Sequence, residues 1–217
     1  MISQKLTPRR IITIILVSAN LCSLVIYLSA WTKPGAQNNK KTIIRPLTLA
    51  QEPIEISIEV KGQPVTATKT VRAERAMRTE EFDGDAHWLR DLTLKVKNKS
   101  EKTITYIVLD LTFPQTATND NRRVGLHQVF LGVDPERKFI RPEIHLAPNE
   151  SIDIPLTARH DDIKKLVESR LSIDNITEME IRIHQVLFDD GTLFETGALY
   201  RRNPDQNDPR KWIKIDN

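Results

Sequence analysis

The chain has 217 residues, a length that suits one domain with a hydrophobic core plus appended segments. Its formal net charge of +3 comes from the N-terminal end, because residues 51–217 hold 25 basic and 29 acidic side chains. The part that folds thus lacks the concentrated basic charge that binding to nucleic acid requires, and no nucleic-acid partner is expected. The single cysteine, Cys22, excludes an internal disulfide.

An uncharged apolar segment occupies residues 11–31, directly after Arg9 and Arg10. At a rise of about 1.5 Å per residue, a helix of this length spans a hydrocarbon core of about 30 Å. We therefore expect a transmembrane signal anchor, with residues 1–10 in the cytoplasm and the rest of the chain outside. A cleaved signal peptide and a lipoprotein signal are the alternatives. Bulky Leu28 in the best cleavage site disfavours the first, and the apolar run that continues past Cys22 disfavours the second.

Residues 32–50 mix Pro, Gly, Asn and Lys with little periodicity, which predicts a linker between the membrane and a domain at 51–217. From residue 54 the apolar positions recur at every second residue, a pattern typical of half-buried strands. The predicted strands cover 54–60, 92–97, 103–113, 124–131, 138–146, 152–157 and 178–188. Ala147-Pro148-Asn149-Glu150 predicts a turn.

Residues 161–169 break this pattern, because apolar residues stand at helical spacing and Asp161 and Asp162 would occupy the first turn of a helix. We expect one short helix that crosses the end of a β-sandwich. Several short strands joined by turns predict a mainly β fold of two packed antiparallel sheets, an immunoglobulin-like β-sandwich that follows the N-terminal transmembrane helix.

Several segments support a resemblance. V-K-N-K-S at 96–100, the strand from Ile104 to Phe113 and L-A-P-N-E at 146–150 resemble the Ig-like modules of bacterial envelope proteins, including the FxLYD type. V-L-F-D-D-G-T-L-F-E-T-G at 186–197, followed by Tyr200 and Trp212, is similar to the end of secreted bacterial proteins. The resemblance covers residues 90–217, although D-L-T-F at 110–113 lacks the Tyr-Asp of the name-giving motif. It implies an exported accessory or binding module and carries no catalytic residues over.

Asp189-Asp190-Gly191 has the composition of either a metal loop or a turn. Adjacent carboxylates point to opposite faces of a strand, whereas a calcium loop needs oxygen ligands at alternate positions. Asp190-Gly191 instead predicts a two-residue type I′ hairpin connection. Asn203, Asp205 and Asn207 do alternate, but Asp208 and Lys214 stand where a calcium loop has Gly and Glu, so a polar turn is expected there.

The remaining motifs predict neither a metal site, nor a cofactor, nor catalysis. The five histidines are scattered, and the sequence holds no nucleotide-binding fingerprint or G-x-S-x-G motif. Exposed aromatic and cationic residues are the side chains that dominate binding interfaces. The candidate partner-binding residues are therefore Trp212, Arg210, Tyr200 and Trp88. Two of them have a plain alternative, with Trp88 in the core and Trp212 in a last edge strand over W-I-K-I.

The absence of an internal disulfide favours a bacterial, periplasmic setting over an animal secreted protein. The sequence therefore predicts a single-pass envelope protein whose outer domain binds another envelope protein or a surface polymer. The alternative is a structural or assembly subunit of a larger membrane complex, with the helix at 11–31 as a contact. An enzyme is not expected.

Overall fold

The computed structural model describes residues 40–47, 52–72, 75–117, 124–134, 142–205, 208 and 211–215. Within these ranges no helix combines the length and the apolar character needed to cross a bilayer, and the predicted anchor at 11–31 lies outside them. The described residues belong to one compact unit that begins at Asn39. This unit is mainly β, and the longest helix among its described residues, α3, has nine residues.

The strands are β1 (Lys40–Leu47), β2 (Ile54–Val60), β3 (Thr66–Arg72), β4 (Arg75–Gly84), β5 (Leu92–Asn98), β6 (Ile104–Phe113), β7 (Gly125–Gly132), β8 (Ser151–Pro155), β9 (Glu178–Phe188), β10 (Leu193–Glu195), β11 (Ala198–Arg202) and β12 (Trp212–Lys214). The helices are α2 (Trp88–Asp91) and α3 (His160–Glu168), with single 3₁₀ turns at Pro114–Thr116, Leu156–Arg159 and Ile173–Asn175.

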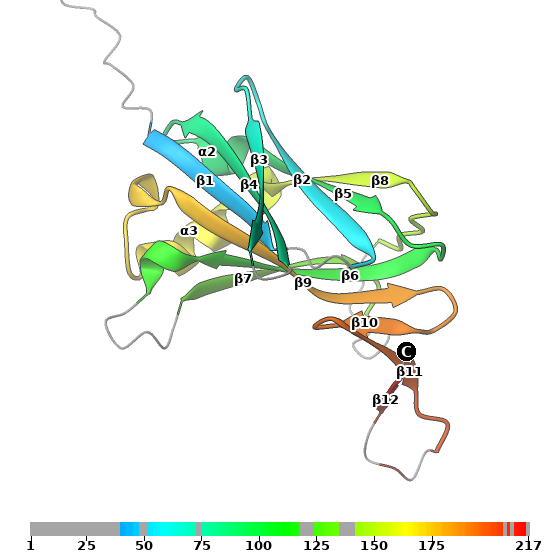
Figure 1. The fold of residues 1–217 in the computed structure, drawn as a ribbon. Helices are drawn as coiled ribbons and strands as arrows, with labels where there is room; N and C mark the ends of the chain where they lie inside the picture. Colours follow the sequence, from blue (N-terminus) through cyan, green and yellow to red (C-terminus); the bar gives the residue numbers. More distant parts are fainter. Residues whose placement is uncertain are drawn as a thin grey trace, which may run out of the picture. The chain divides into compact units, whose positions relative to one another are not determined.

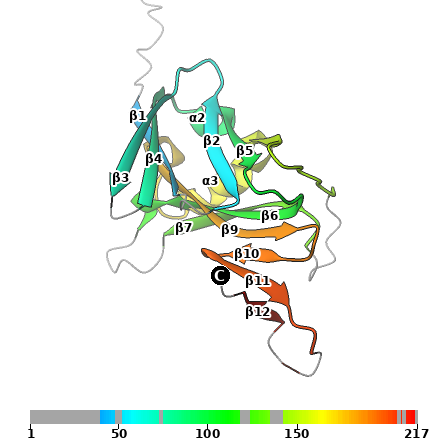
Figure 2. The same ribbon diagram turned by 45° about the vertical axis from the view of Figure 1, so that its right-hand side comes forward.

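The main sheet forks at β9, its central strand (Figures 1 and 2). One edge of β9 pairs with β6, and β7 pairs with the far edge of β6. The other edge of β9 is shared: residues 178–182 pair with β1 in parallel, and residues 185–187 pair with β10 in antiparallel orientation. The sheet continues from β1 to β4 and β3, and from β10 to β11 and β12. We call β10, β11 and β12 the C-terminal arm.

The second sheet, β2-β5-β8, packs on one face of the main sheet. Alternation places Ile54, Ile56 and Ile58 of β2 in the core, as it does the even-numbered residues of β5. On the main sheet the opposing residues are Ile107, Leu109, Leu111 and Phe113 of β6 and Met179, Ile181 and Ile183 of β9, all buried. Ile163 and Val167 of α3 join the same cluster.

Buried Asn98 connects three parts of the body. Its Nδ2 donates to the carbonyl oxygens of Lys102 at 2.8 Å and Leu146 at 2.9 Å. Its Oδ1 accepts from the backbone N–H of Ser100 at 2.9 Å and from the Ser100 hydroxyl at 2.7 Å. The side chain is fully buried, and these four bonds use all its polar capacity. The N-K-S segment thus fixes the β5–β6 loop against the segment before β8.

Glu80 joins the two sheets. It lies on β4 of the main sheet with 1% of its surface exposed, and its Oε2 accepts from the backbone N–H of Ile58 on β2 at 2.9 Å. Arg78 forms an ion pair with the other carboxylate oxygen. Burial raises the pKa of the Glu80 carboxyl, while Arg78 and the Ile58 N–H oppose that shift. The bond to Ile58 satisfies a donor on the open edge of β2.

The sequence patterns predicted most of these elements. The strands over 54–60, 92–97, 103–113, 124–131, 152–157 and 178–188 are confirmed within a few residues, as are the turn over 147–150 and the last strand over W-I-K-I. The helix predicted over 161–169 is observed at His160–Glu168, with Asp161 and Asp162 in its first turn. Its buried residues pack against the core beside β7.

Three predictions were wrong. The linker does not extend to residue 50, since β1 lies between β4 and β9 with Thr42 and Ile44 fully buried; lysines, Thr and Pro46 hid its alternation. The sheets are not purely antiparallel, because β1 runs parallel to β9. In the described part of 138–146, only Leu146 pairs, through an isolated bridge to Ile104. Pro142, which has no N–H, interrupts a ladder there.

Candidate ligand-binding face

The outer face of the main sheet, which is the face turned away from β2, β5 and β8, carries the candidate site. Because side chains alternate along a strand, Tyr106, Val108 and Asp110 of β6 point opposite to the core residues beside them. Val108 pairs with Phe130 and Asp110 pairs with Gln128 on β7. Directly paired residues of antiparallel strands share a face, so these two residues of β7 lie on the outer face as well.

A β-bulge at His184 brings additional polar residues to this face. The pairing shifts from Val108–Gln185 to Leu109–Ile183, which leaves His184 as the extra residue of β9. Before the bulge the buried residues of β9 have odd numbers, and after it the buried residues, Val186 and Phe188, have even numbers. Both His184 and Gln185 consequently lie outside the core. The bulge also coincides with the fork, between the residues that pair with β1 and those that pair with β10.

Asp110 holds two neighbours on the outer face. Nδ1 of His184 lies 3.1 Å from Oδ2 of Asp110, a distance at which the ring N–H donates to the carboxylate. Nε2 of Gln128 donates to Oδ1 of the same residue at 2.9 Å. The carboxylate therefore fixes an imidazole on one side and an amide on the other.

The register of the arm extends this face over three more strands. Leu187 pairs with Leu193, Leu193 pairs with Tyr200, and Tyr200 pairs with Lys214. Direct pairing keeps all of them on one face. Nε2 of Gln185 donates to Oε1 of Glu195 at 2.7 Å, which confirms that β9 and β10 share this face. Arg202 pairs with Trp212, and both belong to the same face of the arm.

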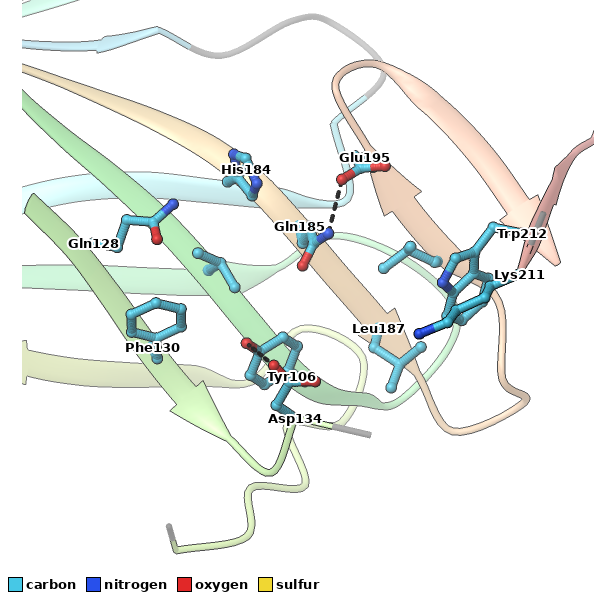
Figure 3. A pocket seen from close by; sticks show the side chains of 12 residues that line it. Tyr106, Gln128, Phe130, Asp134, His184, Gln185, Leu187, Glu195, Lys211 and Trp212 are labelled. Atoms are coloured by element: carbon cyan, nitrogen blue, oxygen red, sulfur yellow. Dashed lines mark hydrogen bonds between the residues drawn. The ribbon is translucent and has the colours of Figure 1, made fainter. Parts of the chain in front are cut away.

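A cavity of about 330 Å³ lies on this face, lined by residues of β6, β7, β9, β10 and β12 (Figure 3). Gln128 and Phe130 line one side of it, and Lys211 and Trp212 line the other. The Tyr106 hydroxyl donates to Oδ2 of Asp134 at 3.3 Å on the floor between them. The lining combines aromatic rings with amides and carboxylates, which can bind a ligand by stacking and hydrogen bonding.

A second cavity, of about 580 Å³, lies on the opposite side of the arm, with Phe188, Phe194 and Lys102 in its lining. Lys102, one of the two lysines in the lining, is already engaged: its Nζ lies 2.7 Å from Oδ2 of Asp190 and donates to the Thr192 hydroxyl at 3.1 Å. The same ammonium group lies 5.5 Å from the centre of the Phe188 ring. These contacts hold the β9–β10 turn to the β5–β6 loop, so we assign this region a structural role.

The four residues predicted to bind a partner separate in the structure. Trp212 lines the cavity, and Tyr200 lies on the same face of the arm. Trp88 is not available to a partner: it is 4% exposed, its Nε1 donates to the carbonyl oxygen of Ile176 at 3.0 Å, and its ring packs against Phe82. Apolar surroundings on α2 bury it, as the alternative interpretation held. Arg210 lies outside the described residues.

The sequence did not predict the polar residues Gln128, His184, Gln185 and Glu195 of the lining, nor Asp110, which bonds to Gln128 and His184 beside it. One signal was present. In I-R-I-H-Q-V-L-F the apolar residues switch from odd positions, Ile181 and Ile183, to even ones, Val186 and Phe188. A change of parity within one strand indicates a bulge, and bulges often redirect side chains near functional sites.

Asp189-Asp190-Gly191 is a turn, as predicted, but of a different type. The Gly191 N–H donates to the carbonyl oxygen of Phe188 at 3.0 Å, and the Phe188 N–H donates to that of Thr192 at 2.9 Å. Of the three loop residues only Gly191 has a positive φ, 77°, so this is a three-residue loop with a glycine bulge. The Lys102 ammonium and the bonds from Thr192 lower the pKa of Asp190 to about 2, against desolvation by burial, the largest single contribution. The carboxylate has a structural role.

The type I′ geometry occurs at the next turn instead. Glu195 pairs with Ala198, and the two residues between them, Thr196 and Gly197, have φ values of 47° and 88°. A type I′ turn needs positive φ at both positions, which Gly adopts freely and a β-branched Thr adopts at a cost. Thr196 is therefore a strained residue that closes the first hairpin of the arm.

Among the described residues, no group of three or more His, Cys, Asp or Glu side chains could hold a metal ion. Comparison of the chain with protein-family models, with curated proteins and with solved structures finds no match in any of the three. The function of the chain is therefore inferred from its sequence and from the outer face.

Proposed function

We propose that this protein is a membrane-anchored, extracytoplasmic binding module of the bacterial envelope, that it catalyses no reaction, and that the outer face at the fork is its ligand-binding surface. The cavity between β7 and β12 carries this proposal, because it gathers aromatic and polar side chains on the face that the second sheet leaves uncovered. The location and the anchor rest on the apolar segment at 11–31.

Hydrogen bonding and stacking are the chemistry that the cavity lining provides. Asp110 orients His184, as a carboxylate does in many general bases, but the described lining includes no Ser, Thr or Cys side chain for the imidazole to activate. The two packed sheets support an Ig-like relationship at the level of architecture, and the parallel β1–β9 pair with the forked arm would be additions to it. Binding is thus the function that these residues favour.

The location can be tested by protease accessibility in intact cells whose outer barrier has been opened. We expect the protease to digest the C-terminal domain from outside, and the chain before digestion to have its full-length mass. Protection of the domain would place it in the cytoplasm and would refute the envelope proposal.

The binding face can be tested by photo-crosslinking in the same cells. A photoreactive residue replaces Gln128, on the outer face, or Lys97, which is exposed on the second sheet and serves as the control. We expect an adduct of higher mass from position 128 and none from position 97. Adducts of equal yield at both positions, or none at position 128, would contradict a specific ligand on the outer face.

A further inference from the structure

We propose that the ligand of the outer-face cavity is a saccharide, bound as one unit of an uncharged or weakly charged polysaccharide. This inference rests on the proposed function and specifies its ligand. A sugar ring presents hydroxyl groups that both donate and accept hydrogen bonds at its edge, and apolar C–H groups on its faces. A site for it therefore needs planar polar side chains beside an aromatic ring.

Two pairs of planar polar side chains meet the first requirement. Gln128 donates to Asp110 at 2.9 Å, and Gln185 donates to Glu195 at 2.7 Å. A primary amide has two N–H donors and one carbonyl acceptor, so each glutamine that spends one N–H on its carboxylate keeps a donor and an acceptor for a ligand. Because each pair is held together before a ligand arrives, little side-chain entropy is lost on binding.

Aromatic rings from opposite sides of the cavity meet the second requirement. Trp212 comes from β12 and Phe130 from β7, with Tyr106 between them in the lining (Figure 3). The face of an aromatic ring is electronegative and attracts the weakly positive hydrogens of C–H groups. A cavity of about 330 Å³ is at the small end of ligand sites, which run from roughly 300 to 1,000 Å³, and it therefore suits a small unit of a longer chain.

Other classes of ligand fit these residues less well. A phosphate-rich polymer would meet the carboxylates of Asp110, Asp134 and Glu195 on this face. An amphipathic helix requires a continuous apolar groove, whereas polar residues interrupt this lining. An extended peptide would add a strand at the edge of β7 or β12, the outer strands that flank the cavity. A peptide paired there would not contact Tyr106, Gln185 and Leu187, which lie on β6 and β9 and are paired on both edges.

The test is isothermal titration calorimetry on the full-length chain in lipid nanodiscs, with cellohexaose, chitohexaose and soluble peptidoglycan glycan strands as probes. We expect at least one probe to bind with a dissociation constant of about 1 mM or tighter. Trp212→Ala, Gln185→Leu and Glu195→Gln should each weaken that binding about tenfold or more. Glu168→Gln, the same chemical change as Glu195→Gln but placed on α3, should leave it unchanged.

Gln185→Leu and Glu195→Gln change little in size, and far-ultraviolet circular dichroism is the check that each variant folds. If all three site variants bind a probe as tightly as the wild type does, the assignment of the ligand to this cavity is overturned. No binding of any probe, together with a protein adduct at position 128, would refute the saccharide while the binding function stands. No binding of any probe and no adduct at position 128 would refute both.

Discussion

The body of the domain and its C-terminal arm use polar side chains in opposite ways. In the body, Asn98, Glu80 and Trp88 are buried, and each polar group serves another strand or loop. Around the arm, Gln185 and Glu195 bond to each other on a half-buried face. The difference indicates that the buried polar groups hold the fold, whereas the polar groups on the half-buried face can bind a ligand.

Truncation of apolar residues on the two faces of β9 should separate the core face from the outer face most strongly. Ile181→Ala leaves a cavity in the core between the sheets, and we expect the free energy of unfolding to fall by about 2–5 kcal/mol. Leu187→Ala, on the outer face of the same strand, should cost less than about 1 kcal/mol. Denaturant unfolding of the full-length chain in detergent measures both. Equal losses would contradict the division of faces.

Asn98→Asp keeps the shape of the side chain and replaces the Nδ2 donor with an acceptor. The new carboxylate oxygen then faces the carbonyl oxygens of Lys102 and Leu146. We therefore expect the free energy of unfolding to fall by about 2–3 kcal/mol in the same measurement. Gln185→Leu, which breaks one bond of the outer face, is the comparison and should cost under about 1 kcal/mol. If Asn98→Asp were neutral, the buried bonds would not hold the body.

Glu80 gives the stability of the body a dependence on pH. Since burial raises the pKa of this carboxyl in the folded state, its ionisation disfavours folding. The penalty is absent below the unfolded pKa of 4.5 and grows as pH rises through the folded value. Unfolding curves from pH 4 to 8 should therefore show that the free energy of unfolding of Glu80→Gln increases relative to that of the wild type as pH rises. A difference that does not change with pH would refute the shift.

The smallest effect is expected in the arm. Thr196→Asn keeps a polar residue at a φ of 47° and favours the left-handed conformation, so stability should rise by about 0.5–1 kcal/mol. The melting temperature of the full-length chain measures this change. Asp189→Asn, in the neighbouring turn at a residue without positive φ, is the control and should leave stability nearly unchanged. A decrease in the melting temperature of Thr196→Asn would mean that the threonine makes a contact that stabilises the fold by more than its backbone strain destabilises it.

The sequence predicted the strands that have a regular alternation and an uninterrupted apolar face, such as β2 and β5. It failed where burial falls on residues that are not apolar: Thr42 in β1 and Glu80 in β4 are both at most 1% exposed. The sequence of such a strand does not alternate between apolar and polar residues, because some of its buried positions hold polar side chains that form hydrogen bonds or ion pairs.

The candidate site was only partly predictable for a related reason. Trp212 and Tyr200 were recognisable as single residues, but the polar lining depends on register, which brings Asp110 and His184 together from strands separated by 74 positions. Only the parity change between Ile183 and Val186 pointed to it. Side-chain pairs across strands are set by long-range pairing, which local patterns do not encode.

The position of β1 has a mechanical consequence. It is the first described element of the domain, so a pull on the chain's N-terminal end enters the domain at Lys40 and runs along this strand. Because β1 lies between β4 and β9, such a load acts along two rows of hydrogen bonds at once and tends to slide the strand lengthwise. Rows that are sheared must rupture together, whereas a strand peeled from an edge loses its bonds one after another. A domain held through β1 is therefore built to stay folded under tension.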